Sequence, residues 1–327
     1  MSKIKVGIVG YGNLGKGAEQ AITQNDDMVL VAVFTRRNPS EVKIATAEAQ
    51  VCHLDDVLQF KDEIDVMLLC GGSATDLPEQ VPALAEHFTT VDSFDTHAKI
   101  PAFFQEVDQA ALRGGNIALI SVGWDPGLFS LNRLLGECVL PQGETYTFWG
   151  DGLSQGHSDA VRRIEGVKQA VQYTLPLEEA VNRVRSGENP SLTTREKHAR
   201  VCYVVVEDGA DQQAIEQTIV TMPNYFDEYE TTVHFIDEAT FTAEHSGMPH
   251  GGFVIRSGES AQQHKQIMEF SLKLESNPGF TSSVLVAYAR AAYRLSHNGE
   301  RGARTVLDVP FGLLSQDDPA TLRKRLL

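Results

Sequence analysis

A glycine-rich segment near the N-terminus has residue types and spacing suited to holding a phosphate group. It reads Gly10-Tyr11-Gly12-Asn13-Leu14-Gly15 and lies between a predicted strand over residues 5–9 and a predicted helix. In a Gly-x-Gly-x-x-Gly turn the first glycine permits the tight turn, the second lets the backbone approach a pyrophosphate, and the third lets helix and strand pack closely. The N–H groups of the helix N-terminus would then face the anion. The pattern predicts a dinucleotide-binding loop, with a structural glycine turn as the alternative.

The residues that end the next predicted strand, 28–35, would select between the two nicotinamide dinucleotides. Domains that bind NAD place an Asp or Glu there, about 20 residues beyond the glycines, to bind the ribose 2′-hydroxyl. This chain has Thr35-Arg36-Arg37, which offers two guanidinium groups and no carboxylate. Because arginine matches the geometry of phosphate, a 2′-phosphate and therefore NADP is predicted. A solvated basic pair at a strand end is the alternative.

Two aspartates follow later predicted strands. Asp95 comes after the strand at residues 89–94, and Asp125 comes after the strand at residues 116–121. In an open parallel sheet, ligands bind beyond the carboxyl ends of the strands. Both side chains are therefore expected at the crevice where a nicotinamide would lie, and there they could hold a substrate ammonium. For either aspartate alone, a turn-forming role is the alternative.

The second half of the chain has polar features of a different kind. Residues 149–159 form a Gly- and Ser-rich loop that enters a helix, and its backbone N–H groups could bind a carboxylate. Residues 247–252 form a tight loop that presents His250. Arg200 begins an apolar strand, where a guanidinium is costly unless it meets an anion. Loop flexibility, helix capping by Ser158 and solvent exposure of Arg200 are the alternative explanations.

Two kinds of domain would position these residues. The first third of the chain alternates short apolar strands, including one at 65–70, with helical patterns, which is typical of a parallel sheet covered on both faces. We predict an α/β fold with a Rossmann-type doubly wound parallel sheet over residues 1–122, to which about residues 278–327 return. Residues 123–277 are expected to form an α+β domain. Its expected strands are 200–207, 231–236 and 268–274, and its expected helices are 159–173, 177–185 and 212–221, followed by a late helix at 281–295.

Composition excludes some partners. Across 327 residues, 28 Lys and Arg stand against 44 Asp and Glu, and a net charge of −16 repels nucleic-acid backbones and anionic lipid surfaces. No stretch approaches the roughly 20 apolar residues of a membrane span, and the apolar N-terminal run is too short for a signal peptide. The four cysteines have no zinc-ligand spacing. We expect a cytoplasmic protein without a metal.

Over essentially its whole length the sequence resembles the meso-diaminopimelate D-dehydrogenase family. The resemblance implies NADP-dependent oxidative deamination of the D-centre of meso-2,6-diaminopimelate to L-2-amino-6-oxopimelate and ammonia, a reversible reaction of lysine and peptidoglycan precursor synthesis. It also implies a homodimer, with a second domain for substrate binding and dimerisation. The segments that carry the resemblance are 9–15, 34–37, 72–76, 123–127, 147–160, 170–174 and 247–252, of which 147–160 contains a long run specific to the family.

The same resemblance assigns site residues by position. The substrate would contact Asp95, Asp125, Trp149, Gln155, Thr174, Arg200, His250 and Asn277. The cofactor would contact the loop Gly10, Tyr11, Gly12, Asn13, Leu14 and Gly15, then Thr35, Arg36 and Arg37, then Cys70, Gly71, Gly72 and Ser73, then Ser93, Phe94 and Asp95, and finally Val122, Gly123, Trp124, Asp125 and Pro126. Gly71 replaces what can be a bulkier residue, which would loosen the packing near the nicotinamide.

Chemistry divides these residues into roles. Asp95 and Asp125 suit the reacting ammonium, whereas Arg200, Thr174 and His250 suit the distal L-amino-acid end. Orientation would be the main catalytic contribution of the protein. The sequence does not single out one general base: Asp125 is a candidate and His157 a weaker one. A reductase like dihydrodipicolinate reductase and a non-catalytic NADPH-sensing regulator remain as alternative functions.

Overall fold

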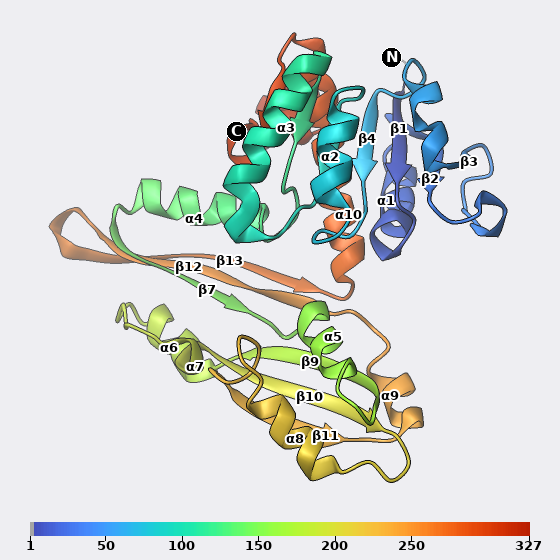
Figure 1. Cartoon of the computed structure of the whole chain (residues 1–327). Helices are drawn as coiled ribbons and strands as arrows, with labels where there is room; N and C mark the ends of the chain where they lie inside the picture. Colours follow the sequence, from blue (N-terminus) through green and yellow to red (C-terminus); the bar gives the residue numbers. More distant parts are fainter. Residues whose placement is uncertain (1–2) are drawn as a thin grey trace. The chain divides into compact units, whose positions relative to one another are not determined.

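The computed structural model describes residues 3–327 and divides into two units (Figure 1). Unit 1 holds the chain up to Leu131 together with Pro278–Leu327, and unit 2 is Asn132–Asn277. The boundary between the units follows Leu131, nine residues later than the boundary that the sequence predicted after residue 122. The reason is that Leu128 and Leu131, in the first turns of α4 (Leu128–Val139), pack against the hydrophobic core of unit 1.

Unit 1 is built on a parallel sheet of seven strands within the described chain, in the order β14-β6-β5-β4-β1-β2-β3. The sequence prediction of a doubly wound parallel sheet is confirmed, although it did not include the short strands β3 and β14. The strands are β1 (Ile4–Val9), β2 (Met28–Thr35), β3 (Gln50–His53), β4 (Val66–Leu69), β5 (Thr90–Asp92), β6 (Ile117–Leu119) and β14 (Gly302–Arg304).

Helices cover both faces of this sheet, which explains why its central strands are apolar throughout. Val66 and Leu68 of β4 belong to a core shared with α1 and α10, whereas Met67 and Leu69 belong to a core shared with α2 and α3 (Figure 1). The helices of unit 1 are α1 (Asn13–Thr23), α2 (Leu77–Ala85), α3 (Ile100–Gly114), α10 (Asn277–His297), whose first residue belongs to unit 2, and α11 (Pro319–Leu326).

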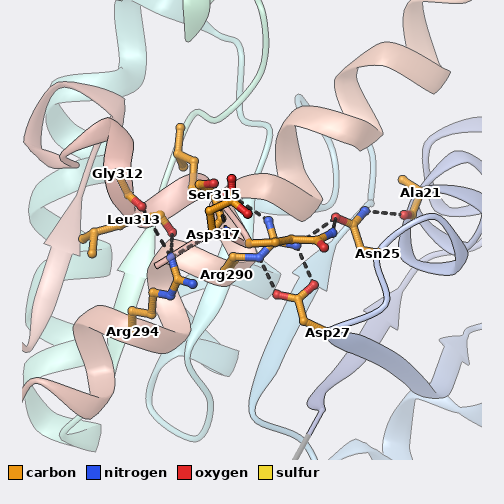
Figure 2. A network of polar contacts seen from close by, with 11 residues as sticks. Ala21, Asn25, Asp27, Arg290, Arg294, Gly312, Leu313, Ser315 and Asp317 are labelled. Carbon is orange, nitrogen blue, oxygen red and sulfur yellow. Dashed lines mark hydrogen bonds and ion pairs between the residues drawn. The ribbon is translucent and has the colours of Figure 1, made fainter. Parts of the chain in front are cut away.

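A buried arginine joins the C-terminal part of unit 1, after residue 277, to the N-terminal part of the same unit (Figure 2). Arg290 of α10 is 2% exposed, and its guanidinium donates to both carboxylate oxygens of Asp27, to Asn25 Oδ1 at 2.8 Å and to the carbonyl of Leu314 at 2.7 Å. These hydrogen bonds hold the pKa of Asp27 below its ordinary value. Arg294, one turn later, donates to the carbonyls of the same C-terminal segment (Figure 2). Charge-assisted bonds therefore join α10, the turn before β2 and the C-terminal segment.

Unit 2 contains two sheets in the described part of the chain. A four-stranded sheet has the order β11-β10-β9-β8, and a three-stranded antiparallel sheet has the order β13-β12-β7. The strands are β7 (Gln142–Trp149), β8 (Gly152–Leu153), β9 (Val167–Pro176), β10 (His198–Val206), β11 (Glu230–Phe235), β12 (His250–Ser260) and β13 (His264–Leu274). The helices are α5 (Gln155–Arg162), α6 (Glu178–Arg185), α7 (Thr194–Lys197), α8 (Gln212–Val220) and α9 (Glu238–Glu244).

One sequence prediction in unit 2 is wrong. The helix expected at 159–173 ends at Arg162, and the strand β9 begins at Val167. Gly166, in the turn between them, has φ +84°, a conformation that an α-helix cannot contain and that glycine adopts without steric cost. The structure confirms the other predicted elements of the second half of the chain to within a few residues, and β10, β13 and α10 begin earlier than predicted. The confirmed strands are 200–207, 231–236 and 268–274, and the confirmed helices are 177–185, 212–221 and 281–295.

Candidate active site

The glycine loop of unit 1 has the three geometries that its pattern predicts. Gly10 has φ +90°, and a Cβ there would lie 3.1 Å from the carbonyl of Cys70. A Cβ on Gly15 would collide with the carbonyl oxygen of Gly10, so the first turn of α1 packs directly on the end of β1. Around Gly12, by contrast, no atom of the described chain lies within 4 Å of the Cβ position. The backbone at Gly12 therefore faces open space in front of a helix N-terminus, as a phosphate cradle requires.

The two arginines at the end of β2 lie beside this loop. The NH2 group of Arg37 donates to the carbonyl of Tyr11 at 2.8 Å, and the backbone N–H of Arg37 donates to Oγ1 of buried Thr35 at 3.1 Å. Arg36 pairs with Asp76 at 2.9 Å, yet its side chain is 65% exposed. The guanidinium of Arg37 is therefore held at the glycine loop and that of Arg36 at the segment after β4, while solvent still reaches both.

The side chain of Tyr11 points into the core of unit 1. Tyr11 is 7% exposed, and its hydroxyl donates to Glu19, which also accepts the N–H groups of Ala45 at 2.8 Å and Thr46 at 2.6 Å. Burial acts to raise the pKa of Glu19, but these hydrogen bonds outweigh it and lower the value. Sequence reasoning missed Glu19, although a glutamate among the apolar residues of an amphipathic helix was a visible signal. Only the backbone of Tyr11 faces the loop, so a contact to a ligand would be made there.

The segment after β4 is packed tightly. The N–H of Gly72 donates to Asp76 Oδ2 at 2.9 Å, and a Cβ on Gly71 would lie 2.8 Å from both Asp76 and Gln80. The space beside Gly71 is thus filled by other side chains of unit 1, and looser packing against a nicotinamide stays a prediction. Burial raises the pKa of the Cys70 thiol to about 12, so this thiol stays protonated at neutral pH.

The two candidate aspartates follow neighbouring strands. Asp95 is exposed and its N–H donates to Ser73 Oγ at 2.9 Å, which joins the segments after β5 and β4. Asp125 is half-buried in a turn after β6 that Gly127 closes, with φ +134° and a Cβ position blocked by the carbonyl of Gly123. Because β5 and β6 pair in parallel, both aspartates lie at one edge of the sheet, as the sequence predicted.

In unit 2 a buried guanidinium stands without a carboxylate. Arg200 of β10 is 7% exposed, donates from NH1 to Thr174 on the neighbouring strand β9, and lies over the Tyr229 ring at 3.9 Å from its centroid. Its Nε has no hydrogen-bond partner, and no ion pair to it occurs among residues 3–327. Burial lowers its pKa from the ordinary arginine value. A buried cation of this kind is costly unless an anion pairs with it.

Trp149 is positioned by a histidine that sequence reasoning missed. His198 Nε2 accepts the backbone N–H of Trp149 at 2.9 Å, and the two rings stack with centroids 5.6 Å apart. Burial first, and then the charge of Arg200, lower the pKa of His198 to about 4, so the ring is neutral and can accept. The signal was available, since His198 precedes Arg200 by two residues and side chains two apart on a strand share a face.

Two glycines bring His250 and Thr174 close to the end of β7. Gly150 has φ +126°, its N–H donates to the carbonyl of Gly251 at 3.0 Å, and a Cβ there would collide with the carbonyl of Thr174. A Cβ on Gly152 would collide with the His250 ring. Any other residue at these two positions would push the strands apart.

The start of α5 and the loop before β12 meet at Met248. Gln155 Nε2 donates to Met248 Sδ at 3.5 Å, and the N–H of Asn277 donates to the carbonyl of Met248 at 2.9 Å. Sequence reasoning gave no role to Met248, and a methionine in a loop carries no distinctive signal. The contacts of unit 2 thus place Thr174 beside Arg200 and bring Gln155 and Asn277 to Met248. Trp149 stacks on His198, and His250 lies beside Gly152.

His157 is anchored rather than free to transfer protons. Its Nδ1 lies 2.7 Å from Ser154 Oγ, and its ring packs edge-on against Tyr225 and Phe226. Burial lowers its pKa to about 4. Ser158 lies inside α5 and bonds to the Ser154 carbonyl, so it does not cap the helix. His157 fixes the start of α5 and is a poor general base.

Neither a membrane span nor a metal cluster is found in the described chain. No helix within residues 3–327 is long and apolar enough to cross a bilayer. Across the same residues no group of three or more His, Cys, Asp and Glu side chains is arranged to hold a metal ion.

Comparisons with known proteins agree on one family. A protein-family model described as diaminopimelic acid dehydrogenase C-terminal domain matches residues 123–276. The chain is 72% identical to the meso-diaminopimelate D-dehydrogenase of Lysinibacillus sphaericus over 100% of both chains. It is similar to the crystal structure of a Clostridium tetani meso-diaminopimelate dehydrogenase variant with DAP, at 58% identity and a TM-score of 0.94 over 99% of this chain and 100% of that one. It is also similar to an engineered D-amino acid dehydrogenase bound to NADP+, at 47% identity and a TM-score of 0.86 over 100% of both chains.

Proposed function

The chain belongs to the meso-diaminopimelate D-dehydrogenase family of oxidoreductases, and we propose that it oxidatively deaminates the D-centre of meso-2,6-diaminopimelate with NADP. The products would be L-2-amino-6-oxopimelate, ammonia and NADPH, in a reversible reaction of lysine and peptidoglycan precursor synthesis. The observation that carries the proposal is Arg200, a buried cation that lacks a counter-ion in the described chain. A substrate with two carboxylates and two ammonium groups supplies that counter-ion.

Unit 1 would hold the cofactor. Gly12 leaves room for a pyrophosphate at the start of α1, where Gly10 and Gly15 allow the turn and the helix to pack closely on β1. The exposed guanidinium groups of Arg36 and Arg37 are suited to a 2′-phosphate. The NADP+ bound to the engineered relative supports this choice. When bound, NADP accepts the hydride from Cα of the D-centre. The residues of this chain supply orientation and charge.

Unit 2 would hold the distal L-amino-acid end of the substrate. The Clostridium tetani variant with DAP replaces a Gln, a Thr, an Arg, a Pro, a His and an Asn. The same residue types occur here, in the same order and at the same intervals, as Gln155, Thr174, Arg200, Pro249, His250 and Asn277. This agreement supports a substrate role for these residues, with Arg200 and Thr174 facing a carboxylate and Trp149 contributing its ring.

The reacting ammonium would be held by Asp95 and Asp125 at the ends of β5 and β6. Ionised carboxylates there favour the ammonium of the bound substrate, and Asp125 is the candidate acceptor of its proton. Loss of that proton leaves a neutral amine, whose oxidation gives an imine. Water adds to the imine carbon, the carbon–nitrogen bond breaks, and ammonia departs. His157 is unsuited to the role of base because both its position and its low pKa keep it as a neutral anchor.

The proposal extends to the setting of the enzyme. We propose a cytoplasmic homodimer whose subunits meet through unit 2. A net charge of −16 suits an enzyme that acts on a small molecule and not on nucleic acid or anionic membrane.

A substrate screen tests the function. The purified chain is incubated with NADP and, separately, with meso-, LL- and DD-diaminopimelate, and NADPH is followed by its absorbance. We expect turnover with the meso isomer, no turnover with the LL isomer, which lacks a D-centre, and weaker turnover with the DD isomer, which lacks the L-end. Binding of NADPH without turnover of any isomer would overturn the proposal in favour of a nucleotide sensor. Reduction of dihydrodipicolinate instead would indicate a ring reductase.

A further inference from the structure

We propose that Asp92, the last residue of β5, is a positioning residue that holds the two segments carrying Asp95 and Asp125 in register with each other. The inference rests on the proposed function, because those two aspartates are the residues assigned to the reacting ammonium. Asp92 itself has no solvent exposure and is assigned no contact with substrate or cofactor.

The contacts of Asp92 reach both segments. Its Oδ1 accepts the N–H of Phe94, in its own segment after β5, at 2.8 Å. The same oxygen accepts the N–H of Ser121, in the segment after the neighbouring strand β6, at 3.2 Å. Its backbone carbonyl accepts the N–H of Val122 at 2.8 Å. The parallel pairing of β5 and β6 stops at Val91 and Leu119. Asp92 therefore continues the connection beyond the ladder, at the point where both chains leave the sheet.

Ser121 shows why this connection matters. Its φ is +56°, in the left-handed region that residues other than glycine adopt only at a cost of about 1 kcal/mol or more. The turn at Ser121 decides in which direction residues 122–125 leave β6. A buried acceptor on its N–H stabilises that turn, and without the acceptor the N–H would be left without a partner inside the protein.

The burial and hydrogen bonding of the Asp92 carboxyl are those of a fixed structural acceptor. Burial raises the pKa of Asp92 to about 7, against the lowering effect of its bonds from Phe94 and Ser121. Its second oxygen, Oδ2, and the hydroxyl of Ser121 are both buried without a hydrogen-bond partner. One oxygen thus carries the two loop contacts, which an amide oxygen could reproduce.

Two further contacts hold residues 93–95 at this edge of the sheet. The N–H of Asp95 donates to Ser73 Oγ, in the segment after β4. Phe94, whose N–H is bound by Asp92, stacks on Phe103 of α3 with ring centroids 4.2 Å apart. The direction of residues 93–95 is therefore set by three neighbours, and Asp92 is the one that also reaches the turn at Ser121.

Two substitutions at Asp92 and one elsewhere test the proposal. Asp92→Ala removes the acceptor, whereas Asp92→Asn keeps an oxygen at the same place. Asp108→Ala is the matched control, since Asp108 of α3 accepts the N–H of Ala303 at 2.8 Å and so joins α3 to β14, the edge strand of the same sheet that pairs with β6. The measurements are kcat, KM for meso-diaminopimelate, affinity for adenosine 2′,5′-bisphosphate, and amide hydrogen exchange.

We expect Asp92→Ala to lower kcat by about 100-fold, because a displacement of about 1 Å in a reacting group has an effect of that size. Adenosine 2′,5′-bisphosphate needs only the glycine loop and the arginines Arg36 and Arg37. Its affinity should therefore change by less than about twofold. Asp92→Asn should restore kcat to within a few-fold of wild type. Faster exchange at Phe94 and Ser121 should appear in Asp92→Ala and not in Asp108→Ala.

Normal kcat in Asp92→Ala, or an equal loss in Asp92→Ala and Asp108→Ala, would overturn the proposal. Failure of the wild type to turn over the substrate would instead sink the proposed function. In that case hydrogen exchange still decides, because protected amides at Phe94 and Ser121 in Asp92→Ala would show that Asp92 does not hold these segments.

Discussion

The arginines that we propose to bind anions have opposite environments in the two units. In unit 1, Arg36 and Arg37 lie in solvent and are already bonded, to Asp76 and to the carbonyl of Tyr11. In unit 2, Arg200 is buried and bonds only to neutral groups, with Nε left without a partner. An exposed arginine gains a modest charge interaction from a phosphate, whereas a buried one gains relief from an unpaired charge. Under the proposed function, the loss of either exposed arginine should therefore weaken NADP binding moderately, whereas the loss of Arg200 should nearly abolish substrate binding.

The largest effect is expected at Arg200. Arg200→Ala should raise KM for meso-diaminopimelate by about 100-fold or more, equivalent to roughly 3 kcal/mol, because a carboxylate would be buried without its charge partner. KM for NADP should stay within a few-fold. Steady-state kinetics with each ligand varied in turn measures both.

Arg256 provides the control for that substitution. It is also a buried arginine of unit 2, 6% exposed, but it bonds to the carbonyl of Leu140 and to Thr145, away from the proposed site. Arg256→Ala should reduce stability and leave KM for the substrate unchanged. An equal rise in KM for meso-diaminopimelate in Arg200→Ala and Arg256→Ala would show that Arg200 has no specific role in substrate binding.

The next effect concerns a buried arginine that does have a carboxylate. Arg290→Ala should lower the free energy of unfolding by about 2 kcal/mol, because it removes charge-assisted bonds to Asp27 and takes the donor away from the half-buried carbonyl of Leu314 and the amide oxygen of Asn25. Urea denaturation measures the loss. KM for either ligand should not change, and a selective change in substrate affinity would show that a buried arginine of unit 1 also serves the site.

A smaller effect is expected at the exposed pair. Arg36→Ala and Arg37→Ala should each raise KM for NADP by about tenfold, which corresponds to one charge-assisted hydrogen bond. Neither should raise KM for NAD, which has no 2′-phosphate. If both cofactors lost affinity equally, the pair would be a structural part of the loop and not a selector of the phosphate.

The smallest effect is a dependence of stability on pH. The bonds from Arg290 lower the pKa of Asp27 in the folded state, below the ordinary value of 3.8. The stability that Asp27 contributes is therefore present above that value and is lost as the pH falls through the lowered folded pKa. The difference in unfolding free energy between wild type and Arg290→Ala should stay constant near neutral pH and shrink in acid. A difference that does not shrink would assign the effect of Arg290 to its carbonyl contacts alone.

The predictability of the site follows the same division. Gly10, Gly12, Gly15 and the arginines after β2 lie within one β-α-β segment, so sequence spacing alone predicted the geometry of the loop, while their contacts with a cofactor stay a prediction. The position of Asp95 and Asp125 after adjacent strands was predictable because parallel strands align their carboxyl ends at one edge of the sheet. In each case a local pattern or a rule of sheet topology was enough.

The substrate side depended on contacts that no local pattern encodes. The ring of Tyr229 and the loop at Met248 reach Arg200 and Gln155 only through the fold. Gly166 was read as part of a helix because the apolar residues around it fit either period, and this hid β9, the strand that carries Thr174. The family resemblance supplied Thr174 and Asn277 where residue chemistry could not.

Isotope transfer tests the central claim most directly. Meso-diaminopimelate is prepared with deuterium on the α-carbon of the D-centre, incubated with the enzyme and NADP, and the reduced cofactor is analysed by mass spectrometry. The account predicts deuterium in NADPH and none at the α-carbons of the product. Deuterium that stays in the organic product, or that moves to the cofactor only when placed on the L-centre, would contradict it.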